Sequence, residues 1–338
     1  MWMVAGGFGR FGWISIMKWL IAGTGSIGKR HINSIRSLRP ESEFVFLRAG
    51  GCIDNLSVEL NAQVVASFED ALVLGPDAVV IATPTAFHGP LLLEVITNGL
   101  PVYIEKPVVC HPTEIDSVRG HIARHGYMAP SMVGCNLRFL PSLKIVQEIL
   151  VQERLGRVVR ASFEVGQWLP DWRPSSDYRD SYSARPDQGG GVVLDLIHEL
   201  DVARWLLGEM VEVKALAAKV SALQIDSESV AGAVMRTVNG AIITVGLDYI
   251  ARKPIRRYQL VGTEGSIAWD LFGRSLILSD GSGEYAIESE DNAFNVLATY
   301  EYAMDEFIVA VESGCATSQP LEEGLLSAQL ALQIKGQL

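Results

Sequence analysis

The feature that most constrains this chain is a glycine-rich loop between a predicted strand and a predicted helix. The loop reads GTGSIG; the apolar run KWLIAG leads into it, and a helical pattern over residues 26–38 follows it. In this context the first glycine allows a tight turn, the second lets the backbone approach a pyrophosphate, and the third lets the helix pack on the strand. The helix N-terminus then offers free N–H groups to an anion. The predicted dinucleotide contacts are Gly23, Gly25, Ser26, Ile27 and Gly28.

Strands and helices alternate along the first part of the chain. Predicted strands cover residues 18–23, 43–48, 77–83 and 101–107, and predicted helices cover residues 26–38, 67–74 and 90–98. The strands are nearly continuous apolar runs, as expected for strands buried on both faces of a parallel sheet. Alternation of this kind indicates helices on both sides of that sheet. We therefore expect an α/β Rossmann domain over residues 17–138.

The pattern changes after about residue 140. Predicted helices cover residues 142–152, 191–207, 295–313 and 321–335, and predicted strands cover 157–168, 211–220, 229–238, 241–250, 256–263, 265–271 and 275–279. Asn239-Gly240 is a hairpin turn signal. Consecutive strands joined by short turns predict an α+β domain over residues 139–338, built on an antiparallel sheet. We expect its last helix to pack back on the first domain.

Composition excludes several classes of protein. The 338 residues suit two domains, and a net charge of −11 provides no basic surface for DNA or RNA. The four cysteines form no CxxC pair and no Cys/His cluster with metal-ligand spacing, so we expect a reducing cytoplasm and no metal. No run of about 18 apolar residues suits a membrane span. Residues 1–16 are apolar but glycine-rich and have no charged start, so we interpret them as a non-native or dispensable leader.

Arg48 stands where the second predicted strand ends. An acidic residue at this position, about 20 residues past the glycines, would bind the ribose hydroxyls of NAD, whereas an arginine nearby accommodates the 2′-phosphate of NADP. We therefore expect NADP to be preferred and NAD to be possible. Alternatively, Arg48 is a solvated side chain that stacks on the adenine of either cofactor.

Two further strand ends carry polar side chains. Ligands of such sheets bind beyond the carboxyl ends of the strands, so the ends of the predicted strands 77–83 and 101–107 are expected to line the dinucleotide site. The residues that follow the first of these strands could instead only start the next helix. Glu105 and Lys106, at the end of the second, could be a surface pair. A lysine is costly to desolvate without a partner, so we interpret the ammonium of Lys106 as a donor to a substrate oxygen. The predicted contacts are Thr83, Pro84, Thr85, His88, Glu105 and Lys106.

A glycine-rich helix supplies the candidate general base. In GGGVVLDLIHELD, Asp195 and His198 are three residues apart and would share one face of a helix. Imidazole titrates near neutral pH, and an adjacent carboxylate could orient the ring and stabilise its protonated form. Asp201 could compete for that role, and a histidine among apolar neighbours could also be structural.

Two segments carry candidate substrate contacts. The loop at residues 167–185 is rich in aromatic and cationic side chains that suit a sugar ring or a phosphate, although it could equally be an ordered loop at a dimer contact. The segment GCNLRF lies at the domain junction, where its polar side chains either face the cleft or brace the domains. The candidates are Trp172, Arg173, Tyr178, Tyr182, Arg185, Asn136 and Arg138.

Together, the motifs GTGSIGKRH, ATPTAFH, EKP, GCNLRFLP and GGGVVLDLIHELD resemble the glucose–fructose oxidoreductase, inositol dehydrogenase and rhizopine catabolism family, from Met17 to the C-terminus. The resemblance implies a C-terminal domain with a large open, mainly antiparallel sheet, through which subunits form a homodimer or homotetramer. It implies that Lys106 contacts the reacting oxygen and that His198 serves as acid/base with Asp195. Many members space these two as DxxxH; the DxxH of this chain resembles a subgroup associated with cell-surface carbohydrate synthesis and puts the role of Asp195 in doubt.

These features predict an NAD(P)-dependent oxidoreductase that transfers a hydride to or from a hydroxyl carbon of a sugar, polyol or nucleotide sugar. Its partner would be a small sugar-like molecule rather than a nucleic acid or a membrane. One alternative is a catalytically silent dinucleotide sensor or regulator on the same fold. Another is a dehydrogenase of a non-sugar diol or an imine. Lys106 and His198 favour an enzyme, because a sensor need keep neither.

Overall fold

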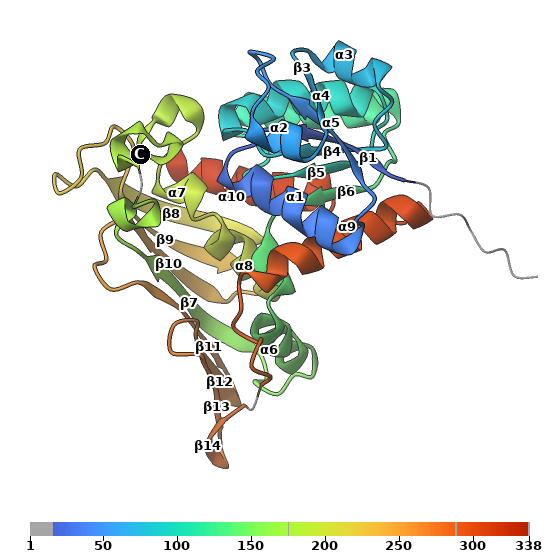
Figure 1. Ribbon diagram of the computed structural model, residues 1–338. Coiled ribbons are helices and arrows are strands. Elements are labelled where there is room, and N and C mark those ends of the chain that lie inside the picture. The colour runs from blue at the N-terminus through green and yellow to red at the C-terminus, as the bar shows by residue number, and fades with distance from the viewer. Residues whose placement is uncertain (1–15, 175, 288, 337–338) are drawn as a thin grey trace, which may run out of the picture.

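The computed structural model describes residues 16–174, 176–287 and 289–336, so the interpretation of residues 1–15 as a leader lies outside the described residues. The chain folds into one lobe around a parallel sheet and a second lobe around a larger, open sheet (Figure 1). Within these ranges, no helix is long and apolar enough to cross a membrane.

In the described part of the chain, the first sheet has six parallel strands in the order β3-β2-β1-β4-β5-β6, which confirms the predicted Rossmann fold. At its centre Leu20 pairs with Val79, and both side chains are fully buried. The strands are β1 (Lys18–Ala22), β2 (Glu43–Leu47), β3 (Gln63–Val65), β4 (Ala78–Ile81), β5 (Val102–Ile104) and β6 (Ser131–Val133). The helices are α1 (Ser26–Leu38), α2 (Asn55–Glu59), α3 (Phe68–Val73), α4 (His88–Thr97) and α5 (Pro112–His125), with the short 3-10 helices η1 (Thr85–Phe87) and η2 (Asn136–Phe139).

The second sheet, within the same ranges, has eight strands in the order β14-β13-β12-β11-β7-β10-β9-β8. Neighbouring strands are antiparallel except β7 and β10, so the expectation of a large open, mainly antiparallel sheet is confirmed. The predicted hairpin joins β9 to β10, with Gly240 at a φ of 86°. The strands are β7 (Val158–Gly166), β8 (Met210–Ala218), β9 (Val230–Thr237), β10 (Ile242–Asp248), β11 (Ile255–Gly262), β12 (Gly265–Asp270), β13 (Ser275–Asp280) and β14 (Gly283–Ala286). The helices are α6 (Pro141–Val151), α7 (Val192–Asp195), α8 (His198–Leu207), α9 (Ala298–Ser313) and α10 (Leu321–Lys335), with η3 (Leu169–Trp172), η4 (Tyr178–Asp180), η5 (Tyr182–Ala184) and η6 (Pro186–Gln188) between β7 and α7.

The structure differs from the sequence-based expectation in two ways. Five helices and strands were missed, namely β3, β6, β14, α2 and α5; the three strands are only three or four residues long, which is too short for a periodic signal. The single helix predicted over residues 191–207 is wrong. It is broken between α7 and α8, where Leu196 adopts φ −97° and ψ 31°.

A buried ion pair ties the two lobes together. Arg138, in η2, donates to both carboxylate oxygens of Asp201 in α8, at 2.8 and 2.7 Å. Ser327 of α10 donates to the same carboxylate at 2.7 Å, and Glu323 of α10 accepts from Arg138 at 3.1 Å. The last helix also contacts β6 and α5 of the first lobe, while α9 packs on α1.

We expect Arg138→Met to lower the free energy of unfolding by about 3–5 kcal/mol, because it leaves the buried carboxylate of Asp201 without its cation. Urea unfolding followed by circular dichroism measures the loss. The control is Arg179→Met, which breaks an exposed ion pair with Asp177 and is expected to change stability little. Equal stability of the two variants would contradict the assignment of Arg138 as the brace between the lobes.

Candidate active site

The glycine loop joins β1 to α1 and has the geometry that its sequence predicts. Gly23 has a φ of 94°, and a Cβ there would lie 2.5 Å from the carbonyl oxygen of Ala82. A Cβ on Gly28 would lie 2.0 Å from the carbonyl oxygen of Gly23, so neither position accepts a side chain without a shift. A Cβ on Gly25 would meet nothing within 4 Å. The middle glycine therefore leaves open space directly in front of the N-terminus of α1, where a pyrophosphate fits.

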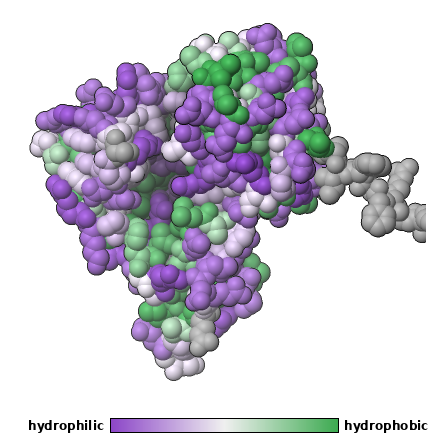
Figure 2. All heavy atoms as spheres, viewed as in Figure 1, coloured by the Kyte–Doolittle hydropathy of each residue, from purple (hydrophilic) through white to green (hydrophobic). Residues whose placement is uncertain are grey.

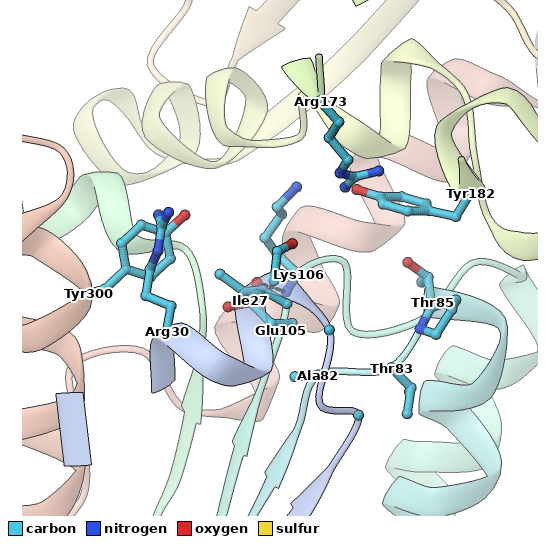
Figure 3. A pocket seen from close by; sticks show the side chains of 14 residues that line it. Ile27, Arg30, Ala82, Thr83, Thr85, Glu105, Lys106, Arg173, Tyr182 and Tyr300 are labelled. Atoms are coloured by element: carbon cyan, nitrogen blue, oxygen red, sulfur yellow. Dashed lines mark hydrogen bonds between the residues drawn. The ribbon is translucent and has the colours of Figure 1, made fainter. Parts of the chain in front are cut away.

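Two hollows lie along the carboxyl edge of the parallel sheet, and the space-filling view shows the molecule hollowed at the junction of its two lobes (Figure 2). The first is a cavity of about 510 Å³, within the usual range of ligand sites. The second, of about 480 Å³, is mainly apolar, includes Leu47, Ala49 and Phe87, and shares Thr83 with the first. The predicted contacts that line the first cavity are Gly23, Gly25, Ser26, Ile27, Thr83, Pro84, Thr85, Glu105, Lys106, Arg173 and Tyr182 (Figure 3).

The break between α7 and α8 supplies the partner of Lys106. In a continuous helix the carbonyl of Asp195 would accept from the backbone N–H of Glu199. Here that N–H instead approaches the carbonyl of Leu196 at 3.4 Å, and Lys106 Nζ donates to the carbonyl of Asp195 at 2.8 Å. A residue of the second lobe thus holds the ammonium that enters the cavity from β5. The Lys106–Pro107 peptide bond, which the sequence left undetermined, is cis.

Glu105 is paired with a histidine that the sequence did not single out. His31, in α1, lies 2.7 Å from a carboxylate oxygen of Glu105, and both side chains are buried. Burial raises the pKa of this carboxyl group, but His31 and Lys106 outweigh it, and the pKa of Glu105 is lowered. The ionised carboxylate therefore lies beneath the cavity with a partner from the helix that carries the glycine loop.

His198 and Asp195 do not form the predicted pair. The carboxylate of Asp195 accepts from the hydroxyl of Tyr249 at 2.6 Å, and His198 Nδ1 has no hydrogen-bond partner among the described residues. Burial, Lys106 and Arg256 lower the pKa of His198 well below its ordinary value. The expectation of a stabilised imidazolium is wrong, and the ring is neutral near pH 7. His198 is not among the described lining residues of this cavity, and this residue is 9% exposed.

Several other predicted contacts have structural partners instead. Asn136 donates to Thr299 of α9 at 2.7 Å and Arg138 braces the lobes through Asp201, and neither belongs to the cavity lining of the described residues. The ion pair with Arg138 also removes Asp201 as a competing base.

His88 lies between two backbone carbonyls, those of Thr83 at 2.8 Å and Pro107 at 2.9 Å, and burial lowers its pKa. It therefore supports the cleft from behind. In the loop, Trp172 packs edge-on against Tyr249, the hydroxyl of Tyr178 accepts from the backbone of Gln224, and Arg185 is exposed. These three do not belong to the cavity lining of the described residues.

Arg48 lies at the end of β2, between two residues that line the second hollow. Its guanidinium donates to the carbonyl of Cys52 at 2.8 Å and to the carboxylate of Asp54 at 3.0 Å, and lies over the ring of Phe46. The hydrogen bond from Arg48 is the main reason why the pKa of Asp54 falls to about 2.

The cavity lining also contains three residues that the sequence analysis missed, namely Arg30, Ala82 and Tyr300. Arg30, one helical turn after Ser26, lies over the ring of Tyr300 of α9 at 4.6 Å, and both line the cavity. The spacing of four residues from the glycine loop was a usable signal for Arg30. Tyr300 had none, because only the packing of α9 on α1 brings it there.

Comparison with known proteins places the chain in a family. The model for the oxidoreductase family with an NAD-binding Rossmann fold matches residues 17–132, and the GFO/IDH/MocA C-terminal domain matches residues 143–268. The inositol 2-dehydrogenase of Rhizobium meliloti (strain 1021) is 30% identical over 274 residues, which cover 75% of this chain and 76% of that protein. The chain belongs to the GFO/IDH/MocA oxidoreductase family.

Two solved structures with lower sequence identity to this chain have the same fold. UDP-N-acetylglucosamine 3-dehydrogenase GnnA from Acidithiobacillus ferrooxidans superposes with a TM-score of 0.76 at 21% identity, over 95% of this chain and 97% of that one. The WlbA dehydrogenase from Bordetella pertussis, solved with NADH and UDP-GlcNAcA, gives a TM-score of 0.79 at 20% identity, over 95% and 96%. Members of this family are hydride-transfer oxidoreductases.

We expect Lys106→Met to raise the pKa of His198, because the substitution removes one of the two positive charges that depress it. An NMR pH titration of the imidazole, assigned with His198→Asn, measures the change. In the wild type the midpoint should lie below the ordinary value of about 6.5, and in the variant it should move upward. Lys219→Met, at an exposed position beyond β8, should leave it unchanged. A wild-type midpoint at or above 6.5 would contradict the neutral base.

Proposed function

We propose that this chain uses NAD(P) to oxidise or reduce a hydroxyl-bearing carbon of a sugar, polyol or nucleotide sugar. The proposal rests on one observation: the open space over Gly25 and the ammonium of Lys106 belong to the same cavity. The hydroxyl of Thr83 adds support, since it is buried in that lining without a partner among the described residues and would gain one from a bound ligand. The names of the relatives, inositol 2-dehydrogenase and UDP-N-acetylglucosamine 3-dehydrogenase, favour the same range of substrates.

The bound nicotinamide supplies the acceptor or donor of the hydride, and the chain supplies the rest. In the oxidative direction Lys106 donates to the substrate hydroxyl oxygen, held in place by the carbonyl of Asp195. The hydroxyl proton passes to the neutral ring of His198 as the carbon–hydrogen bond breaks and the carbonyl forms. Its lowered pKa suits this step, because a protonated ring could not accept the proton. Asp195 then acts as a positioning residue for Lys106.

The proposed preference is for NADP over NAD. Arg48 supports it, because its guanidinium lies at the end of β2, next to the apolar hollow that suits an adenine ring. A 2′-phosphate there would take the place of Asp54 as the anionic partner of Arg48. NAD has no such group and would leave the ion pair intact.

We propose that residues 17–138 hold the cofactor and that residues 139–338 bind the substrate and form a homodimer or homotetramer. The second sheet supports the assembly, since Leu216 and Val234 on its neighbouring strands β8 and β9 are 82% and 51% exposed, respectively. A cytoplasmic location is the proposal that suits four unpaired cysteines.

Reduced-nicotinamide absorbance tests the proposed function, with NADP or NAD and a panel of polyols, aldoses and UDP-sugars. We expect turnover with one class, greater with NADP, and a loss of about 10²–10⁴-fold in His198→Asn and Lys106→Met. Arg48→Asp should lower the ratio of NADP to NAD efficiency. Tight cofactor binding without turnover across the panel would favour the silent sensor. Full turnover in His198→Asn would overturn the assignment of the base.

A further inference from the structure

The cavity is positively charged although the chain as a whole is acidic. Among its lining residues, Arg30, Lys106 and Arg173 are cations and Glu105 is the acid. That carboxylate is already engaged by His31 at 2.7 Å, and the chain carries a net charge of −11. The carboxylate of Asp195 is buried nearby and bonded to Tyr249, so two acids stand against three cations. The cleft lining therefore carries an excess of positive charge, and low-dielectric walls strengthen its effect on a ligand.

Among the described residues, Arg173 has no carboxylate partner in the cavity lining. It lies in the irregular segment after β7, and its guanidinium is 5.4 Å from the centre of the Tyr182 ring, which also lines the cavity. No carboxylate within 4 Å pairs with it among the described residues. By contrast, its loop neighbours Arg179 and Arg185 lie against Asp177 and Asp187.

The other two cations already have a proposed role, Arg30 near the cofactor and Lys106 at the reacting hydroxyl. Arg30 is on α1, one turn from the helix N-terminus that suits the pyrophosphate, and Lys106 is fixed by the carbonyl of Asp195. Arg173 belongs to the second lobe and enters the cavity from the side opposite the glycine loop, while Lys106 rises between them from the sheet edge (Figure 3). Its position separates it from the dinucleotide and leaves it for the second ligand.

We propose that the substrate carries an anionic oxygen group, a carboxylate or a phosphate, and that Arg173 binds this group while Lys106 holds the reacting hydroxyl. This inference rests on the proposed function, since it assigns the substrate class of the same cleft. The guanidinium of Arg173 can bind either anion through paired N–H donors. The ring of Tyr182 packs against this guanidinium and restricts its orientation. A neutral polyol would leave this guanidinium in the cleft without a counter-charge.

Calorimetric titration of the protein saturated with reduced cofactor tests the proposal without turnover. Malonate and inorganic phosphate are the probes, and the tighter of the two identifies the carboxylate or the phosphate as the group that is recognised. We expect saturable binding that weakens about 10- to 150-fold in Arg173→Met, the loss of one charge-assisted pair. Arg173→Lys should keep part of it. Arg185→Met is the matched control on the same loop, outside the cavity lining, and should bind as the wild type does.

Substrate pairs then separate this inference from the proposed function. D-glucuronate and D-glucose 1-phosphate are compared with D-glucose in the absorbance assay and by titration. Anion binding that depends on Arg173, together with no hydride transfer on any panel member, would uphold the anion site and overturn the proposed function. Failure of both probes to bind the wild type, or equal binding to Arg173→Met, would overturn the inference even if neutral polyols are turned over.

Discussion

The bidentate ion pair between Arg138 and Asp201 fixes where α8 lies relative to the parallel sheet, and α8 begins with His198. The first residue of this pair follows the last strand of the Rossmann sheet, and the second lies one turn into the helix of the other lobe. Because α10 adds Ser327 and Glu323 to the same cluster, three distant segments meet at one buried charge pair. The proposed catalytic chemistry depends on this contact, since it requires groups from both lobes.

A second line of contacts leads from the glycine loop to the cleft floor. His31 on α1 holds the carboxylate of Glu105, and the next residue, Lys106, reaches the carbonyl that the end of α7 leaves free. The helix that receives the pyrophosphate is therefore linked through buried polar groups to the lysine that would hold the substrate oxygen. Burial and the nearby charges of Lys106 and Arg256 also keep His198 neutral. Lys106 therefore contributes both to holding the substrate oxygen and to the protonation state of the proposed base.

Local patterns were enough to predict the Rossmann fold of the first lobe, although its elements β3, β6, α2 and α5 were missed. The bounds of α1 agree with the prediction, and the conformations of Gly23 and Gly28 follow from their spacing, because a strand-to-helix turn permits few alternatives. The break before His198 was not predictable from periodicity, since the apolar spacing continues through it. The carbonyl of Asp195, which loses its helical hydrogen bond at the break, accepts from Lys106 instead, and Lys106 is distant in the sequence. Likewise, the sequence left open whether Arg138 faces the cleft or braces the lobes, because the position of Asp201 is a property of the tertiary fold.

The central claim is that a nicotinamide dinucleotide occupies the space over Gly25, and a titration of NADH and NADPH onto wild type and Gly25→Val tests it most directly. Gly25 has φ −70° and ψ −166°, an extended conformation that valine adopts, and its Cβ would meet no protein atom within 4 Å. The variant should therefore fold with an unchanged melting temperature while its side chain fills the place of the pyrophosphate. We expect saturable enhancement of nicotinamide fluorescence in the wild type and its loss in the variant. Equal binding by both proteins, or no binding by the wild type, would contradict the account.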